Sequence, residues 1–210
     1  MRSVLILLLA GIPALASGPE SLPLPKPQVD GGKPLMQALS QRKSSREFKD
    51  TRLPAQELSN LLWAAYGVNR PDGHRTAPSA MNKQTVDVYV LTSDGAYLYN
   101  APAHRLDLVA SADLRAAAGT QAFVAGAPLN LVYVADNDRM SNWSESDRLL
   151  FSGAETGFIG QNVYLYCASE GLATVIRASI NREALAQALK LRPSQRISLS
   201  QTVGYPLISK

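Results

Sequence analysis

The sequence predicts a single α+β domain, for three reasons. Apolar residues recur every three or four positions across 54–66, which is the spacing of one buried helix face. Across 86–99 they alternate instead, around a Ser-Asp-Gly turn, and this pattern is typical of an antiparallel hairpin. Helical and strand segments follow one another without regular strand–helix–strand alternation, so the α+β class is favoured over α/β.

The first 16 residues predict a cleavable secretory signal peptide. Arg2 supplies a positive charge, residues 3–16 are almost wholly apolar, and Ala14-Leu15-Ala16 provides small residues before a cut at Ser17. A membrane-spanning helix needs about 20 apolar residues, more than this segment has, although an uncleaved anchor is the alternative interpretation. We therefore expect an exported, periplasmic protein with no stable membrane association after cleavage.

Residues 17–34 contain five prolines and three glycines without apolar periodicity, so they predict an extended arm or linker. The folded domain is expected to be 35–210. Its expected elements, in chain order, are a helix from Leu35 ending near 42–46, a helix from Pro54 to Gly67, the hairpin of 86–99, a helix over 113–118, a strand over 129–135, a long helix over 146–169 capped by Gly171, a helix over 182–189 and a strand over 196–203.

Composition narrows the possible functions. The net charge of +4 comes from scattered residues rather than from a Lys/Arg block, which argues against a nucleic-acid partner and in favour of a small anion. The one cysteine, Cys167, cannot form an intrachain disulfide and is expected to be buried and inert. Because His74 and His104 are the only histidines, we expect neither a catalytic triad nor a metal site.

Three polar clusters carry the functional signal, and the first is the stretch RKSSREF at 42–48. Its cations and hydroxyls can bind a phosphate and a polar sugar-like chain, since a guanidinium forms two parallel hydrogen bonds to phosphate. A solvated helix end is the alternative interpretation. The second cluster, RTAPSAMNKQ at 75–84, offers the Asn82 amide, which can pair with a donor–acceptor edge, or it is an ordinary polar turn.

The third cluster combines GFIGQN at 157–162 with GLATVIRA at 171–178. Each glycine inside a helix costs about 1 kcal/mol relative to alanine, so Gly157 and Gly160 indicate close approach of a flat group. A helix–helix crossing explains them equally well.

Together and in this order, the three clusters resemble the nitroreductase family. RKSSREF is similar to that family's Arg-Arg-Ser-x-Arg-x-Phe box, PSAMNKQ to its Pro-Ser-x-x-Asn-x-Gln box, and GQNVYLYCASEGLATV to its helix followed by Gly-Leu-Gly-Thr. The hairpin DGAYLYNAPAHRL and the closing VGYP are similar to the branch that includes azoline- and thiazoline-type peptide dehydrogenases. The resemblance spans 34–210.

The resemblance implies a central, mostly antiparallel sheet flanked by helices, in an intertwined homodimer that binds FMN between its subunits. It implies an FMN-dependent oxidoreductase that passes electrons or hydride through flavin N5, to or from a small organic substrate, by a ping-pong mechanism. The flavin then carries the chemistry, so no side chain is expected to act as a nucleophile.

The resemblance also implies residue roles. Arg42 and Ser44 would hold the phosphate and ribityl chain, Arg46 would lie at the pyrimidine edge, and Asn82 would bind the ring from the partner-facing loop. Backbone N–H groups near 176–178 would face N5, and Lys210 would complete the phosphate site. The full set expected to contact FMN is Arg42, Lys43, Ser44, Arg46, Pro78, Ser79, Asn82, Gln84, Ile176, Arg177 and Ala178.

Two other functions stay open at the level of sequence. The first is an exported flavin-binding protein without turnover, and the second is a structural or partner-binding domain in which RKSSR is only surface. The sequence does not distinguish nitro compounds, quinones and thiazoline-like heterocycles as substrates, and it does not identify the electron donor.

Overall fold

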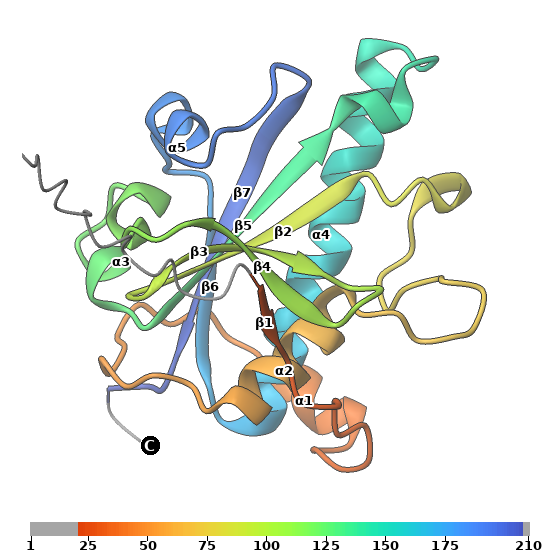
Figure 1. Ribbon diagram of the computed structural model, residues 1–210. Coiled ribbons are helices and arrows are strands. Elements are labelled where there is room, and N and C mark those ends of the chain that lie inside the picture. Colours follow the sequence, from red (N-terminus) through yellow and green to blue (C-terminus); the bar gives the residue numbers. More distant parts are fainter. Residues whose placement is uncertain (1–20, 208–210) are drawn as a thin grey trace, which may run out of the picture.

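A computed structural model describes residues 21–207 as one seven-stranded sheet packed between helices (Figure 1). The strand order is β1-β4-β3-β2-β5-β7-β6, and every neighbouring pair is antiparallel. The predicted α+β class with an antiparallel sheet is therefore confirmed. The strands are β1 Ser21–Pro23, β2 Val86–Thr92, β3 Gly95–Asn100, β4 Arg105–Ala110, β5 Leu129–Asp136, β6 Ala173–Arg177 and β7 Gln195–Gly204. The helices are α1 Leu35–Gln41, α2 Ala55–Tyr66, α3 Phe123–Gly126, α4 Glu145–Glu170 and α5 Arg182–Ala188, with 3-10 turns η1 Ala80–Asn82, η2 Arg115–Ala118 and η3 Asn137–Met140.

The elements with strong periodicity lie where the sequence predicts them, within a few residues at each end. The expected helix over 113–118 is only the 3-10 turn η2, and strands β4 and β6 were not predicted. The segment expected as an extended arm contains β1, which pairs with β4, so the sheet begins before Leu35. The signal-peptide prediction for residues 1–16 concerns residues outside those that the structure describes.

Hydrophobic cores cover both faces of the sheet. On one face α2 and α4 pack against the strands, with Leu61, Leu62 and Ile159 fully buried against Tyr133. On the other face α5, the residue after it and α3 contribute Leu185, Leu189 and Val124, respectively. Because β5 is buried on both faces, its sequence is almost uniformly apolar rather than alternating.

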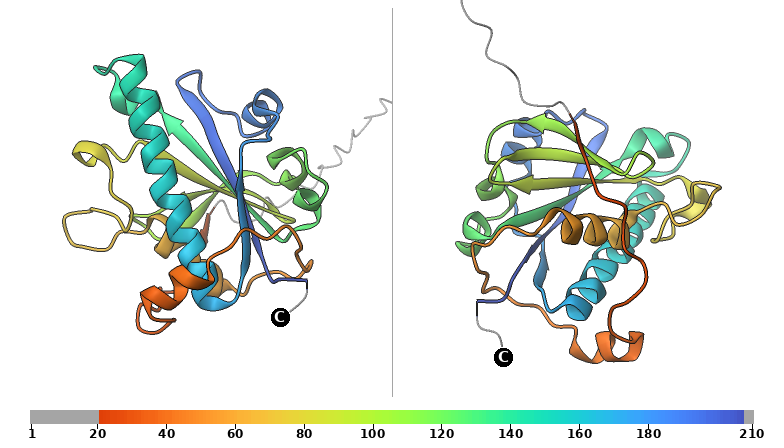
Figure 2. Two further views of the ribbon diagram at one scale, coloured as in Figure 1. Left: turned by 180° about the vertical axis from the view of Figure 1, so that it is seen from behind. Right: turned by 60° about the horizontal axis from the view of Figure 1, so that its bottom comes forward.

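Helix α4 is the longest element and lies across one face of the sheet (Figure 2). Ser144 caps its start, where Ser144 Oγ accepts a hydrogen bond from the Asp147 N–H at 3.1 Å, and Gly171 ends it in the left-handed region at φ 76°. Its 26 residues span about 39 Å. Cys167 lies on its buried side, as predicted. Between residues 21 and 207, the chain has no helix that is both long and apolar enough to cross a bilayer.

His104 fastens the extended arm to the domain. Its Nε2 lies 3.1 Å from the Pro25 carbonyl oxygen and 2.7 Å from Ser59 Oγ on α2, and its Nδ1 lies 2.9 Å from Tyr99 Oη. Burial lowers the pKa of His104, because the charged imidazolium would lose hydration. The arm is therefore held by a neutral imidazole.

This arrangement predicts an acid-sensitive stability. The pKa of His104 is lower in the folded protein than in the unfolded chain, so as pH falls the unfolded chain binds a proton at the higher pH. The free energy of unfolding therefore falls as pH drops below about 6.5. We expect His104→Asn to flatten this slope in urea titrations between pH 7 and 5, since asparagine tolerates the left-handed φ of 46°. His74→Asn is the matched control, and an unchanged slope in His104→Asn would contradict the assignment.

Candidate functional site

Residues 42–47 form neither helix nor strand, and their side chains divide between Tyr164 on one side and a cleft on the other. Ser44 Oγ lies 2.8 Å from Tyr164 Oη of α4, and the Arg42 guanidinium lies over the Tyr164 ring, 5.0 Å from its centroid. Tyr164 Oη also accepts a hydrogen bond from the backbone N–H of Ile176 at 3.0 Å. The structure therefore brings the first and third sequence clusters together, with Tyr164 between them.

A large cleft adjoins this cluster. Its volume is about 940 Å³, which lies within the range of about 300–1,000 Å³ that is typical of ligand pockets. Lys43, Ser45 and Glu47 line it, together with Tyr164 and Thr174, whereas the alternate residues of the stretch do not. Ser45 N–H donates to the Thr174 carbonyl oxygen at 2.9 Å, which ties the stretch to β6.

The cations of this region fit a phosphorylated ligand. Arg42, Lys43 and Arg46 lie within five residues, and none of them forms an ion pair with another described residue. Lys43 and Arg46 are exposed, and Arg42 is half-buried against Tyr164. Cations held close together without carboxylate partners are suited to a phosphate dianion, so the residues present fit the phosphate and ribityl part of FMN.

Residues 176–178 divide between the two faces of the sheet. The side chain of Ile176 faces α4, where a Cβ added at Gly160 would lie 2.7 Å from Ile176 Cδ1. The Arg177 side chain is buried and donates hydrogen bonds to Thr202 Oγ1 at 2.7 Å and Asn130 Oδ1 at 2.8 Å. Burial lowers the pKa of Arg177 to about 10. Arg177 could therefore contact a cofactor only through its backbone, while Ala178 is exposed.

The second sequence cluster is anchored by Glu155, a buried residue of α4. Its carboxylate accepts hydrogen bonds from Ser79 Oγ at 2.7 Å, from Thr85 Oγ1 at 2.8 Å and from the backbone N–H groups of Thr85 and Val86 at 3.2 Å each. Tyr66 Oη donates to the same carboxylate, and burial raises the Tyr66 pKa. One acidic side chain thus fixes the 79–86 segment against α4.

The backbone of this loop is strained. Met81 and Gln84 have φ values of 52° and 49°, in the left-handed region that such residues rarely adopt, and Asn82, at 53°, is of a residue type that tolerates this region. Gln84 Nε2 donates to Asn82 Oδ1 at 3.0 Å, and Gln84 Oε1 accepts from Arg75 Nε at 2.8 Å. Pro78 and Asn82 remain exposed, so the loop presents the Asn82 amide at the surface.

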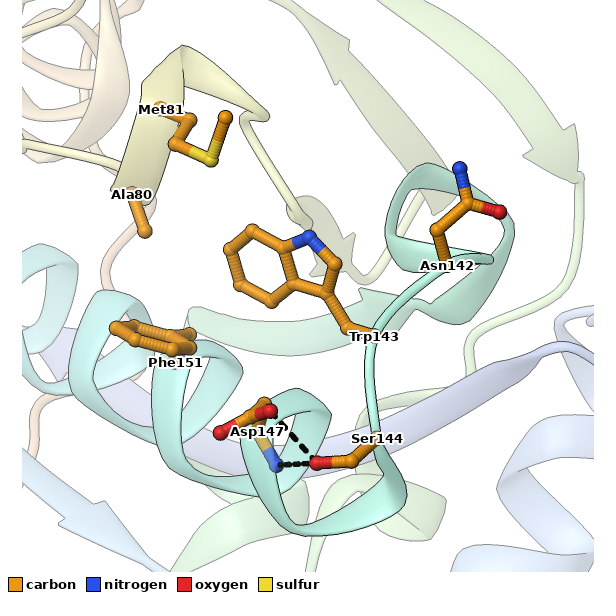
Figure 3. A pocket seen from close by; sticks show the side chains of 7 residues that line it. All are labelled: Ala80, Met81, Asn142, Trp143, Ser144, Asp147 and Phe151. Atoms are coloured by element: carbon orange, nitrogen blue, oxygen red, sulfur yellow. Dashed lines mark hydrogen bonds between the residues drawn. The ribbon is translucent and has the colours of Figure 1, made fainter.

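A second pocket, of about 450 Å³, lies beside this loop (Figure 3). The indole of Trp143 and the ring of Phe151 form its aromatic walls, with ring centroids 4.9 Å apart at 68°. Figure 3 shows Met81 and Ala80 of the loop facing these rings across the pocket. Its lining residues are Ala80, Met81, Asn142, Trp143, Ser144, Asp147 and Phe151.

Within one chain the predicted site residues fall into two separate groups. Ser44 and Ile176 meet at Tyr164, whereas Ser79 is bound to Glu155, nine residues earlier on α4 and about 14 Å away along its axis. Sequence reasoning did not single out Tyr164, Glu155 or Trp143. Their roles depend on tertiary contacts, and the one available signal was that all three lie in or beside the long helix. The predicted contacts with a flavin remain predictions, and Lys210 lies outside the described residues.

Comparison with known proteins identifies the class to which this fold and site belong. A family model described as "Nitroreductase family" matches residues 39–205. The chain therefore belongs to the nitroreductase family, whose members are FMN-dependent oxidoreductases, and the resemblance inferred from the three clusters is confirmed.

Particular relatives support this assignment. The "Putative nitroreductase MJ1384" of Methanocaldococcus jannaschii is 33% identical over 168 residues, which cover 75% of this chain and 85% of that protein. A crystal structure described as a putative nitroreductase from Ralstonia eutropha JMP134 is 44% identical, with a TM-score of 0.87 over 95% of this chain and 96% of that one. The NADPH:FMN oxidoreductase of Vibrio harveyi, complexed with NAD+, shares the fold at 18% identity, with a TM-score of 0.64 over 83% of this chain and 70% of that one.

Replacing the Glu155 carboxylate tests its role in holding the loop. All the groups that bind Glu155 are donors, so the amide of Glu155→Gln would set its own N–H groups against them. We expect a loss of about 2–4 kcal/mol in the free energy of unfolding, measured by urea denaturation. Glu145→Gln, at the exposed start of α4, should cost less than about 1 kcal/mol. Equal losses in both variants would refute the anchoring role.

Proposed function

We propose that this protein is an FMN-dependent oxidoreductase that acts on a small organic substrate as a homodimer, with each flavin site built from two chains. The observation that carries the proposal is the division of the site: unpaired cations and Ser44 lie at one end of α4, and the exposed Asn82 amide lies at the other. Family membership supports the cofactor, and the cation cluster fits its phosphate.

Bound FMN would supply hydride and electron transfer at its N5 position. Arg42 and Lys43 would bind the phosphate, and Ser44 would bind the ribityl hydroxyls. Arg46 would place positive charge at the pyrimidine edge, where it favours the reduced, more negative form of the ring system. The protein would bind and orient the cofactor and the substrate and would exclude water, and the cofactor would supply the electron transfer of a ping-pong cycle.

The outer face of α4 provides the surface for a second copy of the chain. Leu150 is 63% exposed and Phe158 is 47% exposed, and together they leave an apolar patch on the surface of α4. Gly153 and Gly157 have open space around their Cβ positions, so another helix could approach closely there. The exposed positions of this face are Leu149, Leu150, Phe151, Gly153, Ala154, Gly157, Phe158 and Gln161.

Antiparallel packing of two α4 helices on this face would complete the site. If the two-fold axis passes between Gly157 and Phe158, Phe151 of one copy lies level with Tyr164 of the other, because each residue is about 10 Å from the axis along the helix. The loop that contains Asn82 lies beside Phe151, since Ala80 and Met81 share a pocket with it. The Asn82 amide of one copy would then face the Ser44 and Tyr164 cluster of the other.

Export of this protein to the periplasm is part of the proposal, supported by the charged start, short apolar run and small residues of segment 1–16. Outside the cytoplasm nicotinamide nucleotides are scarce, so another donor would supply the electrons. N-terminal sequencing of the protein recovered from the periplasmic fraction is expected to begin at Ser17. A protein that keeps Met1, or stays with the membrane, would overturn this part.

Subunit complementation tests the shared site. Arg42→Glu should remove a contact with the phosphate, and Asn82→Gly should remove a contact with the ring, since glycine keeps the left-handed backbone at position 82. We expect the homodimer of each variant to bind FMN at least about ten-fold more weakly than the wild type. A mixed dimer of the two variants contains one undamaged site and one doubly damaged site. We therefore expect it to recover about half of the wild-type flavin absorbance.

Two controls sharpen this experiment. Adding Phe158→Asp to both copies should abolish the recovery, because a charge on the α4 face opposes pairing of the chains. Flavin binding at wild-type strength in both single variants, or no recovery in a verified mixed dimer, would refute a site shared between chains. Reoxidation of the photoreduced protein by an organic acceptor distinguishes an enzyme from a flavin carrier without turnover.

A further inference from the structure

We infer that the buried side chain of Arg177 holds a positive charge behind the strand edge at which the flavin is proposed to bind, and that this charge favours the reduced form of the cofactor. The inference rests on the proposed function, because it concerns the same flavin site. It goes further by assigning a role to a side chain that faces away from that site and acts through space.

Arg177 is a buried cation without an anion beside it. It is 7% exposed, and its guanidinium donates to three neutral acceptors, which are Thr202 Oγ1 at 2.7 Å, Asn130 Oδ1 at 2.8 Å and the Ala118 carbonyl oxygen at 3.2 Å. Between residues 21 and 207, no carboxylate forms an ion pair with it. Burial lowers the pKa of Arg177 to about 10, because the charged guanidinium loses hydration, so the side chain stays protonated at neutral pH.

The surrounding acceptors do not depend on this arginine. Ser200 Oγ also donates to the Ala118 carbonyl oxygen at 2.7 Å, and Thr202 Oγ1 donates to Asn130 Oδ1 at 2.6 Å. Arg177 Nε is itself buried, and no group in the described part of the chain accepts a hydrogen bond from it. A buried unpaired donor and an uncompensated charge both cost stability, so stability alone does not account for an arginine at this position.

Gly119 leaves the space that the guanidinium occupies. A Cβ added at Gly119 would lie 2.6 Å from Arg177 Nε, which is closer than a real Cβ contact allows. The φ of Gly119 is −179°, an extended conformation that any residue adopts. The side chain of Arg177, and not the backbone, therefore accounts for glycine here.

The outer edge of β6 faces the proposed flavin site. The Thr174 carbonyl oxygen accepts from the Ser45 N–H at 2.9 Å, and the Ile176 N–H donates to Tyr164 Oη at 3.0 Å. Alternate residues of an antiparallel strand direct their backbone groups to the same edge. The N–H of Ala178 therefore continues this row, beside the residues that we assign to FMN.

The charge of Arg177 is close enough to act on a ligand at this edge. Arg177 directly precedes Ala178, so its guanidinium lies within about 10 Å of any atom that the Ala178 N–H binds. At about 10 Å and an effective dielectric constant of about 20, one unit charge changes the relative affinity for two ligands that differ by one charge about ten-fold. Reduced flavin is the more negative ligand, so it gains affinity. Arg182 donates to the Ala178 carbonyl oxygen at 3.2 Å, but it is exposed and therefore screened by water and salt.

Paired substitutions of Arg177 test the inference. The Kd values of oxidised FMN and of reduced FMN are measured for each variant, the second under anaerobic conditions, and their ratio gives the shift in midpoint potential. We expect Arg177→Met to weaken the binding of reduced FMN about ten-fold more than that of oxidised FMN, which corresponds to a fall of about 30 mV for a two-electron couple. Arg177→Lys keeps the charge and should leave the ratio within about two-fold of the wild-type value.

A second variant cancels the charge without removing the arginine. Asn130→Asp places a carboxylate where the amide oxygen now lies 2.8 Å from Arg177 Nη2, so the pair has no net charge and the same fall in potential is expected. This variant supplies the test if Arg177→Met does not fold. Arg196→Met, the matched control, removes a cation from an exposed position of β7 and should leave the ratio unchanged.

The outcomes separate a charge effect from a packing effect. Folded, FMN-loaded Arg177→Met or Asn130→Asp with the wild-type ratio would overturn the inference. Equal shifts in Arg177→Met and Arg177→Lys would also overturn it, because they would assign the side chain to packing. Each of these results leaves the proposed function standing, whereas wild-type protein that binds no FMN would overturn both.

Discussion

The buried carboxylate of Glu155 fixes the geometry on which the rest of the site depends. Helix α4 would pack against the sheet through Ile159 and Val163 without it, but the loop of residues 79–84 would lose the hydrogen bond that ties Ser79 to α4. An isolated buried carboxylate is costly, and here several donors from three segments offset that cost. Because the donors come from α2, the loop and β2, the same interaction aligns all three against one turn of α4.

At the other end of α4, the backbone of residues 42–47 positions polar and charged side chains. Ser44 and Arg42 contact Tyr164, while Lys43 and Ser45 line the neighbouring cleft. Tyr164 in turn accepts a hydrogen bond from β6, so a loop, a helix and a strand converge on one phenol. The position of the polar stretch 42–47 therefore depends on its contact with the rigid helix α4.

Sequence patterns predicted the parts of this fold that follow local rules. The end of the long helix could be located from its cap residue Gly171, and the hairpin from its Asp-Gly turn, because both signals act within a few residues. Strand β1 was not predicted, since three residues in a proline-rich segment become a strand only by pairing with β4.

The roles of single residues were harder to predict for the same reason. Glu155 in a helix is ordinarily read as solvent-exposed, and only the tertiary fold shows that donors surround it. Arg177 lies in a segment correctly matched to the family, yet its side chain belongs to the opposite face of the sheet. Periodicity could not resolve this, because β6 was not recognised as a strand and the direction of its side chains was therefore undetermined.

A flavin site shared between two chains, as we propose, would make cofactor binding and association a single equilibrium. If a flavin contacts Ser44 of one chain and Asn82 of another, it binds the dimer and not the monomer, so its binding free energy stabilises the dimer by the same amount. In that dimer the exposed glycines of α4 would have a consistent explanation. Each weakens the helix by about 1 kcal/mol, and each would allow the second chain to approach closely enough to share a ligand. In the dimer that we propose, the apolar face of α4 would be covered by the second chain, and the loop of residues 79–84 would contact the shared ligand.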